Sequence, residues 1–322
     1  MPEIDLHALR AGDRRALAKA ITLTESSLPE HRVLAQELLE SLLPYTGNSI
    51  RIGISGVPGV GKSTFIETFG QLLVKEERRV AVLAVDPSSP LAGGSILGDK
   101  TRMERLSREA NVFIRPSPAG GALGGVAQKT RESLLLCEAA GYDVILVETV
   151  GVGQSEHQVA GMVDFFMLLV LPGGGDELQG IKRGIVELAH ALVINKADGD
   201  AVRIAERTQS QYQSAMTMLR KDALWDPRVM RCSALENDGL DLVWEMIQEY
   251  MTGLKANGRL HQLRARQSRE WMHELVRAML EERLLTSQAV RQELSSLESR
   301  VEQQVMTPYA GARTILSLLD GS

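Results

Sequence analysis

The chain has 322 residues, 44% of them hydrophobic and 24% charged, a composition that excludes a disordered, collagen-like or low-complexity protein. Its 36 basic and 41 acidic residues give a net charge of −5, so the surface has no general attraction for nucleic acid or anionic lipid. Two well-separated cysteines, Cys137 and Cys232, form neither a disulfide framework nor a CxxC metal pair. No apolar run approaches the ~20 residues of a membrane helix, and the N-terminus lacks the apolar segment of a signal peptide. We therefore expect a cytoplasmic protein without nucleic-acid or membrane partners.

Residues 1–47 are predicted to form a helical arm. The first amphipathic stretch of this arm carries Leu6, Leu9, Leu17 and Ile21 on one face, and a second runs from Pro29 to Leu43. From 48 to 256, helical segments alternate with near-continuous apolar runs, which is typical of a mostly parallel sheet covered by helices on both faces. The seven predicted strands are IRIGIS, RVAVLAV, NVFIR, DVILVE, FFMLLVL, ALVINK and RVMRCS.

Residues 257–322 are predicted to be a helical C-terminal extension. A long helix from Leu260 to Leu285 precedes two shorter ones, and Pro308 is placed to open the last. The long helix carries an apolar stripe that must be buried against some surface. Packing on its own domain and a two-fold dimer are both open, and symmetry favours the dimer.

The first predicted strand leads into GVPGVGKST, residues 56–64, and a helix follows. This matches the GxxxxGK[ST] phosphate-binding loop in the strand–loop–helix context that it requires. The glycines let consecutive N–H groups converge on phosphates, and the helix N-terminus adds partial positive charge. We expect Lys62 to reach the β- and γ-phosphates, Ser63 to ligate Mg²⁺ and Thr64 to contact the α-phosphate. The predicted nucleotide-binding residues here are Gly56, Val57, Pro58, Gly59, Val60, Gly61, Lys62, Ser63 and Thr64.

A base pocket is predicted where the strand ALVI ends in Asn195-Lys196-Ala197-Asp198. The Asp198 carboxylate can accept N1–H and N2–H₂ of guanine, whereas adenine offers an acceptor at the equivalent edge. Asn195 would support the pocket and the Lys196 stem would cover the base face. Alone, NKAD could be an ordinary turn. The segment follows the phosphate-binding loop in the sequence and precedes Ser233-Ala234-Leu235, a loop that can present a backbone N–H to guanine O6. This order of motifs favours GTP over ATP as the bound nucleotide.

Acidic residues at strand ends and in loops are candidates for the Mg²⁺ and γ-phosphate site. Glu148 ends the strand DVILVE, and Gly151 can turn its N–H toward a γ-phosphate. Asp86 and Asp99 have loop contexts, although a lone Asp there can equally be a helix cap or an Asx-turn. Val152 stands where many GTPases carry a water-positioning Gln, so we expect slow unaided hydrolysis.

The stretch from Gly173 to Lys182 begins with three glycines and continues with two acids. Such a segment cannot pack as a core element. It is either a plain surface loop or a loop placed to move at the nucleotide edge of the sheet, and the residues alone leave both open.

Together these segments resemble the MeaB/ArgK-type GTPases, to which the human MMAA protein is similar: the cobalamin chaperones of adenosylcobalamin-dependent methylmalonyl-CoA mutase. The segments are GVPGVGKST, AVDPSSP, GGSILGDKTRM, FIRPSP, LLCEAAGYDVILVETVGVGQSE, GGGDELQGIKRG and VINKAD. They are specific, because GGSILGDKTRM and GGGDELQGIK are not generic GTPase motifs. The resemblance implies a P-loop NTPase fold of the SIMIBI class.

The resemblance also implies roles for individual residues. Lys62, Ser63, Asp86, Asp99 and Glu148 would be the phosphate, Mg²⁺ and hydrolysis set, with some metal contacts through water. The switch residues would be Gln154, Asp176, Glu177, Gln179 and Lys182, with Gln179 and Lys182 responding to the mutase.

For partners, the resemblance implies a homodimer that binds GTP or GDP with Mg²⁺ and gates adenosylcobalamin loading of the mutase, or protects and reactivates it. The client would be methylmalonyl-CoA mutase or a related acyl-CoA mutase, and a cobalamin adenosyltransferase would be a further partner. Adenosylcobalamin would be held by the partner enzyme, because this chain has no DxHxxG segment.

Two alternative functions come from related classes of nucleotide-binding protein. A GTP-dependent nickel chaperone would need Cys or His ligands near a switch, and both cysteines look like buried small hydrophobes. The family's older label, a transport-associated kinase, would need a general base near an acceptor pocket, and no residue beyond the GTPase acids is a candidate.

Overall fold

The computed structural model describes residues 4–85, 103–116, 123–149, 154–173, 183–218 and 225–320. They divide into two compact units, Met1–Leu260 and His261–Ser322. The N-terminal helices therefore belong to the same unit as the sheet. The domain boundaries expected at residues 48 and 257 stay predictions.

The first unit is built on a seven-stranded sheet in the order β3-β2-β4-β1-β5-β6-β7, in which every pair of neighbouring strands is parallel. All seven predicted strands are present, and the α/β fold is confirmed. The strands are β1 Ile50–Gly56, β2 Val80–Val85, β3 Val112–Arg115, β4 Val144–Thr149, β5 Phe165–Val170, β6 Ala191–Ile194 and β7 Arg228–Arg231.

Helices follow the strands as parallel pairing requires, because each connection must cross from one end of the sheet to the other. In this unit they are α1 Leu6–Arg10, α2 Arg14–Glu25, α3 Pro29–Leu42, α4 Lys62–Lys75, α6 Glu104–Arg108, α7 Leu123–Ala139, α8 Gln154–Ala160, α10 Arg183–Val186, α11 Val202–Met218 and α12 Leu240–Ala256. Short 3₁₀ turns cover Leu43–Tyr45 and Gly199–Ala201.

The sheet is buried on both faces, which explains its near-continuous apolar strands. Along β5, Phe165, Met167 and Leu169 face one core, with side chains from α4 and α12. The alternate residues Phe166 and Leu168 face the other core, with side chains from α7 and α8. The strand period of two thus divides the apolar residues between two layers.

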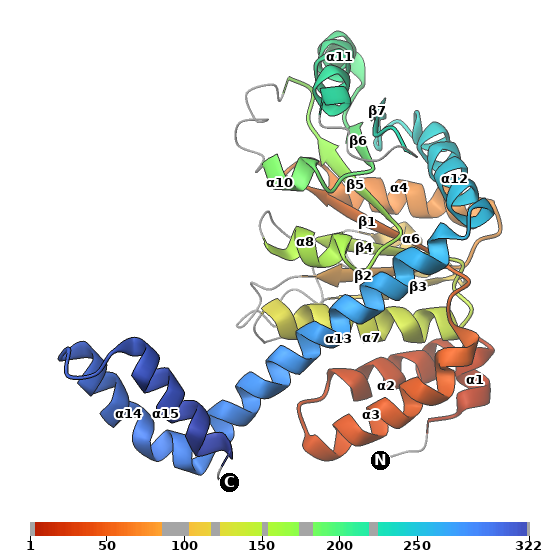
Figure 1. The fold of residues 1–322 in the computed structure, drawn as a ribbon. Coiled ribbons are helices and arrows are strands. Elements are labelled where there is room, and N and C mark those ends of the chain that lie inside the picture. Colours follow the sequence, from red (N-terminus) through yellow and green to blue (C-terminus); the bar gives the residue numbers. More distant parts are fainter. Residues whose placement is uncertain are drawn as a thin grey trace. The chain divides into compact units, whose positions relative to one another are not determined.

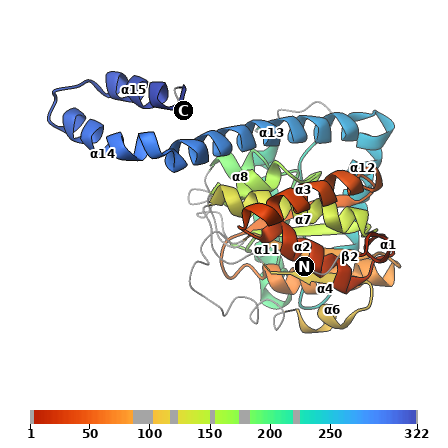
Figure 2. The ribbon, with the colours of Figure 1, turned by 90° about the horizontal axis from the view of Figure 1, so that it is seen from below.

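The N-terminal helices form an outer layer over α7. Figure 1 and Figure 2 show α2 and α3 lying against α7, on its side away from the strands. The loop before α2 is tied to the rest of the unit by Arg79, whose guanidinium donates to the carbonyls of Gly12 and Ala140 at 3.4 and 3.0 Å and lies over the Tyr142 ring. The predicted helical arm is therefore integral to the unit's packing.

The second unit contains three helices, α13 Arg259–Thr286, α14 Gln288–Glu302 and α15 Pro308–Asp320, with the first two residues of α13 counted in the other unit. All three are predicted by the sequence, including Pro308 as the first residue of α15. The helices α14 and α15 pack as a pair, where Gly311 allows close approach to Val301. None of the described helices combines the length and apolarity that a membrane crossing needs.

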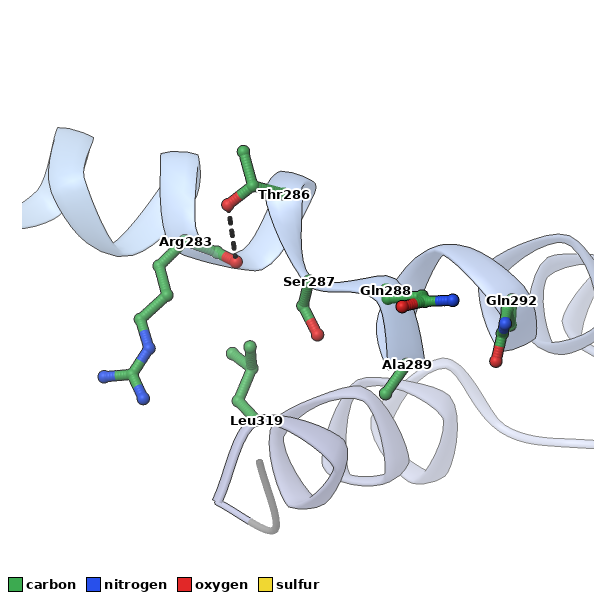
Figure 3. A pocket seen from close by; sticks show the side chains of 7 residues that line it. All are labelled: Arg283, Thr286, Ser287, Gln288, Ala289, Gln292 and Leu319. Atoms are coloured by element: carbon green, nitrogen blue, oxygen red, sulfur yellow. Dashed lines mark hydrogen bonds between the residues drawn. The ribbon is translucent and has the colours of Figure 1, made fainter. Parts of the chain in front are cut away.

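A shallow hollow of about 570 Å³ lies where α13 passes into α14, beside Leu319 of α15 (Figure 3). Its lining carries one charged group, Arg283, and the remaining residues are small, amide-bearing or apolar. Ser287 caps α14 by accepting a hydrogen bond from the Val290 N–H. The hollow thus lies at the connection between two helices, and the residues that line it do not form a cluster of charged groups that could bind a ligand.

Candidate nucleotide site

The phosphate-binding loop joins β1 to α4 at the carboxyl edge of the sheet. The strand β1 lies between β4 and β5, with β2 and β3 beyond β4 and with β6 and β7 beyond β5. The loop after β1 therefore lies where the strand order reverses, which is the point where ligands bind in open α/β sheets. Gly59 and Gly61 have φ of +82° and +92°, which other residues rarely adopt. A Cβ on Gly61 would lie 2.8 Å from Asn195 Nδ2, so this glycine also makes room for a second motif.

The N-terminus of α4 has backbone donors that fit phosphate. No side chain caps this helix, and among the described residues the N–H groups of Lys62, Ser63 and Thr64 make no hydrogen bond. Uncapped first-turn N–H groups carry the positive end of the helix dipole and form an anion site. The donor set therefore fits the phosphates of a nucleotide, and Ser63, the predicted Mg²⁺ ligand, belongs to the same turn.

Lys62 lies folded over the loop that precedes it. Its ammonium donates to the carbonyls of Gly56 and Val57 at 2.7 and 3.4 Å. Burial lowers the pKa of Lys62, and the carboxylates of Glu148 and Glu156 act in the opposite direction. The cation is thus held at the loop by carbonyl oxygens and by two nearby negative charges.

The predicted base segment contacts the phosphate-binding loop directly. Buried Asn195 donates from Nδ2 to the Val60 carbonyl at 2.9 Å, and Lys196 donates from Nζ to the Gly59 carbonyl at 2.8 Å. Lys196 has a left-handed backbone, with φ of +61°. The two motifs, far apart in sequence, therefore form one hydrogen-bonded unit.

The loop after β7 closes the other side of this pocket. Asn195 Oδ1 accepts from the Ala234 N–H at 3.1 Å, and the Asp198 carboxylate accepts from the Ser233 hydroxyl. Thr68 of α4 donates to the Ala234 carbonyl at 2.8 Å, while the Leu235 side chain is 76% exposed. The structure thus brings Asn195, Asp198 and the Ser-Ala loop together, and the Ala234 N–H is already bonded to Asn195.

A groove of about 720 Å³ runs from this loop along α4. Its lining includes Thr64, Thr68 and Gln71 of α4, with Ala234 and Leu235 on the opposite wall. The groove places Thr64 beside Ala234 and Leu235 of the loop after β7, and its lining includes neither Lys62 nor Asn195 nor Asp198.

Glu148 lies buried near the carboxyl end of β4, beside Ile54 of β1 and Ala84 of β2. Its charge acts on Lys62, so the structure brings these two predicted residues together. Of Gln154 the structure describes only the backbone, which opens α8. The remaining predicted site residues lie outside the described ranges: Asp86, Asp99, Gly151, Asp176, Glu177, Gln179 and Lys182, together with Val152.

Sequence reasoning missed three buried polar residues next to the site, Ser55, Thr149 and Glu156. Ser55 and Thr149 stand at the ends of apolar strands, and Glu156 lies in the first turn of α8. A polar side chain at a strand's buried end was the available signal, because such a group needs a partner.

The two cysteines do not form a metal site with each other. Cys137 belongs to the core on the α7 face of the sheet, and Cys232 to the core on the α4 face. Burial raises the pKa of both thiols, with Glu138 adding to the effect at Cys137, and that of Cys232 rises to about 12 with a contribution from Asp238. Thiols held protonated on opposite faces give no support to the nickel-chaperone alternative.

A parallel sheet, a GxxxxGK loop at its switch point and an Asn-Lys-x-Asp segment bound to that loop define a P-loop nucleotide-binding protein of the GTPase class. The family model described as "Methylmalonyl Co-A mutase-associated GTPase MeaB" matches residues 17–289. The chain belongs to this family, and the resemblance found in the sequence is confirmed.

Relatives and a solved structure support the assignment over nearly the whole chain. A "Putative GTPase" of Caulobacter vibrioides is 54% identical, with 98% of each chain covered. The mouse "Methylmalonic aciduria type A homolog, mitochondrial" is 46% identical over 95% of this chain and 76% of its own. A crystal structure titled "LAO/AO transport system kinase" matches with a TM-score of 0.79 and 41% identity, covering 98% of this chain and 96% of that one.

Proposed function

We propose that this protein binds and hydrolyses GTP and uses that cycle to gate adenosylcobalamin loading of methylmalonyl-CoA mutase or a related acyl-CoA mutase, and to protect or reactivate it. GTP binding is supported by the hydrogen bonds of Asn195 and Lys196 to the phosphate-binding loop, with Asp198 in the same segment. The family, which is described as mutase-associated, supports the partner.

In this proposal the first turn of α4 binds the phosphates, and Lys62 leaves the Gly56 and Val57 carbonyls to pair with the β- and γ-phosphates. Mg²⁺ neutralises phosphate charge when bound, with Ser63 as a ligand and Asp86, Asp99 and Glu148 around it, some through water. Gly151 turns its N–H to the γ-phosphate. Asp198 selects guanine by accepting two hydrogen bonds.

We further propose slow basal hydrolysis that the mutase accelerates through the switch residues Gln154, Asp176, Glu177, Gln179 and Lys182. The mutase holds the adenosylcobalamin, and a cobalamin adenosyltransferase is a further partner. For the compartment we propose the cytoplasm, which cell fractionation tests. A mouse relative is named mitochondrial.

A homodimer is proposed through the helical extension. Met272, Val276, Met279 and Leu280 are exposed apolar side chains within nine consecutive residues of α13. Apolar side chains gathered on one element support an interface, and two-fold symmetry is the common arrangement.

The first test concerns the base. Asp198→Asn exchanges one acceptor for a donor, so GTP affinity should fall about tenfold or more while xanthosine triphosphate gains. Titrations with GTP, ATP and xanthosine triphosphate measure this. Equal binding of ATP and GTP by the unsubstituted chain contradicts the guanine assignment.

The second test concerns the phosphates. Lys62→Ala should lower single-turnover hydrolysis about a hundredfold or more, since it removes a cation that stabilises developing charge. Arg78→Ala, an exposed cation on the segment after α4, is the matched control and should hydrolyse GTP normally. A Lys62→Ala variant with full activity rules out the assigned role.

The third test concerns the partner. Saturating mutase should raise single-turnover hydrolysis at least about tenfold, equivalent to ~1.4 kcal/mol of activation free energy. Lys182→Ala should lose most of that stimulation and keep the basal rate and GTP affinity. An unchanged response in the variant, or no acceleration in the parent, contradicts the switch assignment.

A further inference from the structure

The groove of about 720 Å³ beside α4 is held in shape by two α4 side chains. Thr68 donates to the Ala234 carbonyl at 2.8 Å and ties α4 to the loop after β7. Glu67 Oε1 accepts from the backbone N–H groups of Arg105 and Leu106, at 2.9 and 3.2 Å, and ties α4 to α6. All three elements contribute residues to the lining. The groove is therefore preorganised, which lowers the cost of binding a ligand there.

Close packing of α4 and α6 adds to this rigidity. Leu106 is fully buried and lies over Gly70, where a Cβ would come within 2.6 Å of the Leu106 side chain. Glu67 and Gly70 are three positions apart on α4 and share one face of the helix. The packing contact and the hydrogen bonds thus act on the same end of α6, and together they hold the Glu67 carboxylate at the wall of the groove.

One oxygen of Glu67 is left without a donor. Oε2 is shielded from solvent and has no hydrogen-bond partner within the described ranges, whereas the other carboxylate of the lining, Glu76, accepts from Trp244 Nε1 at 2.7 Å. A shielded acceptor that lacks a donor is costly, so such an atom calls for an explanation. Because a carboxylate oxygen only accepts, the group that would satisfy it is a hydrogen-bond donor.

A guanine nucleotide would bring such a donor to the groove. Thr64, the predicted contact of the α-phosphate, lies three positions before Glu67 on α4, and both residues line the groove. Ala234 and Leu235, from the predicted guanine loop, line the opposite wall. The ribose is the link between the α-phosphate and the base, so it must lie between the residues that contact each of them. Its hydroxyl groups are therefore expected at this groove.

We propose that Glu67 binds the ribose of the nucleotide, with Oε2 accepting a hydrogen bond from the 2′- or 3′-hydroxyl while Oε1 keeps its bonds to α6. The inference rests on the proposed GTP-binding function and deepens it by naming a residue that distinguishes ribonucleotides from deoxyribonucleotides. Acidic side chains bind ribose hydroxyls in this way in dinucleotide sites. The terminal torsion of a Glu side chain is soft, so a small rotation of the carboxylate turns Oε2 toward the hydroxyl.

A carboxylate that served only to cap α6 would not distinguish one sugar from another. Its loss would change the stability of the chain and would affect the affinities for all nucleotides alike. Loss of a ribose contact instead changes the ratio of two affinities, one for the nucleotide with the hydroxyl and one for the nucleotide without it. Because both affinities are measured on the same variant, this ratio is independent of any general effect on folding.

The experiment is a calorimetric titration of the full chain with GDP, 2′-deoxy-GDP and 3′-deoxy-GDP. The unsubstituted chain should bind GDP about tenfold or more tightly than at least one of the deoxy analogues, as expected for a hydrogen bond to a charged acceptor. Glu67→Gln keeps a carbonyl oxygen for the α6 N–H groups and puts a neutral amide in place of Oε2. In this variant the ratio should fall to about threefold or less, since the charge-assisted bond is lost.

Glu76→Gln is the matched control, because it removes the other carboxylate of the lining and keeps an acceptor for Trp244. It should retain the tenfold preference. Equal affinity of the unsubstituted chain for GDP and both analogues overturns the assignment, and so does an unchanged ratio in Glu67→Gln. A chain that binds no nucleotide refutes both this contact and the proposed function. If adenine nucleotides bind equally well with the same dependence on Glu67, the guanine assignment is wrong and the ribose contact stands.

Discussion

The α/β unit and the helical unit bury their apolar side chains to different extents. In the former, large side chains such as Trp244, Phe69 and Phe165 are fully buried in one core, and Phe166 and Tyr212 are buried in the other. Among the described residues of the helical unit, Val290 and Leu297 are the buried apolar side chains, while Met279 and Leu280 are 66% and 57% exposed. The first unit has its own core, whereas the second leaves several of its large apolar side chains exposed.

The units also differ in how they use buried polar groups. Around the nucleotide site, Asn195, Ser233, Ser55 and Thr149 are buried and hydrogen-bonded. In the helical unit the described salt bridge, Arg266 with Glu270, is exposed and weak in its effect. Buried polar networks fix a unique geometry. The buried network therefore gives the nucleotide site a fixed geometry.

The largest expected effect is on the core of the α/β unit. Trp244 is buried on α12, contacts Phe69 edge-on and donates to Glu76. Trp244→Ala should lower the free energy of unfolding by about 3–5 kcal/mol, because it leaves a large cavity. Urea unfolding measures the change. A loss below about 1 kcal/mol would contradict the tightly packed core described for this unit.

The intermediate effect is on the helical unit. If α13 forms the proposed dimer interface, Met279→Glu should shift the dimer toward monomer and weaken association by about 1–2 kcal/mol, since it places a charge among apolar side chains. Light scattering over a range of concentrations measures this. Glu281→Gln, at an exposed charged position nearby, is the control. If the parent is monomeric at every concentration, the interface proposed for α13 is wrong.

The smallest expected effect concerns a buried carboxyl of the α/β unit. Burial raises the pKa of Glu132, against hydrogen bonds from Gln128 and Gln36, above its usual value of 4.5. Its favourable contribution is therefore full below pH 4.5 and is lost as pH rises through the folded-state pKa.

Glu132→Gln removes the ionisation and keeps the acceptor oxygen. The variant should be more stable than the parent at pH 7, by less than about 1.5 kcal/mol, and the gap should close on acidification. Thermal unfolding at pH 4 and pH 7 measures it. A variant less stable than the parent at pH 7 would mean that the ionised carboxyl is favourable here.

Much of the fold follows from the sequence because its apolar pattern is strong. The seven strands are nearly continuous apolar runs, and Pro308 opens its helix because proline fits a first helical turn. The phosphate-binding loop was predictable because its glycines and Lys62 act through local backbone geometry. The contact between Asn195 and Val60 was not, since it depends on β5 and β6 lying beside β1 in that order.

The contact between Ser55 and Thr149 could not be predicted for a related reason, although each of them, as a polar residue at a buried strand end, signalled the need for a partner. Single polar residues at strand ends have no periodic signal, and whether two of them meet depends on which strands are neighbours. Here β1 pairs with β4, so Ser55 meets Thr149 although they are 94 positions apart. The roles of Asp86, Asp99 and the switch residues stay predictions.

The bonds of Asn195 and Lys196 to the phosphate-binding loop have a consequence for folding kinetics. They join residues 135 and 137 positions apart, so their formation requires closure of a very long loop. Contacts of such high order form once the intervening strands have paired. We therefore expect the nucleotide pocket to be assembled late, after the folding transition state. A bound nucleotide would then slow unfolding and leave the folding rate almost unchanged, so it would increase the kinetic stability of the protein.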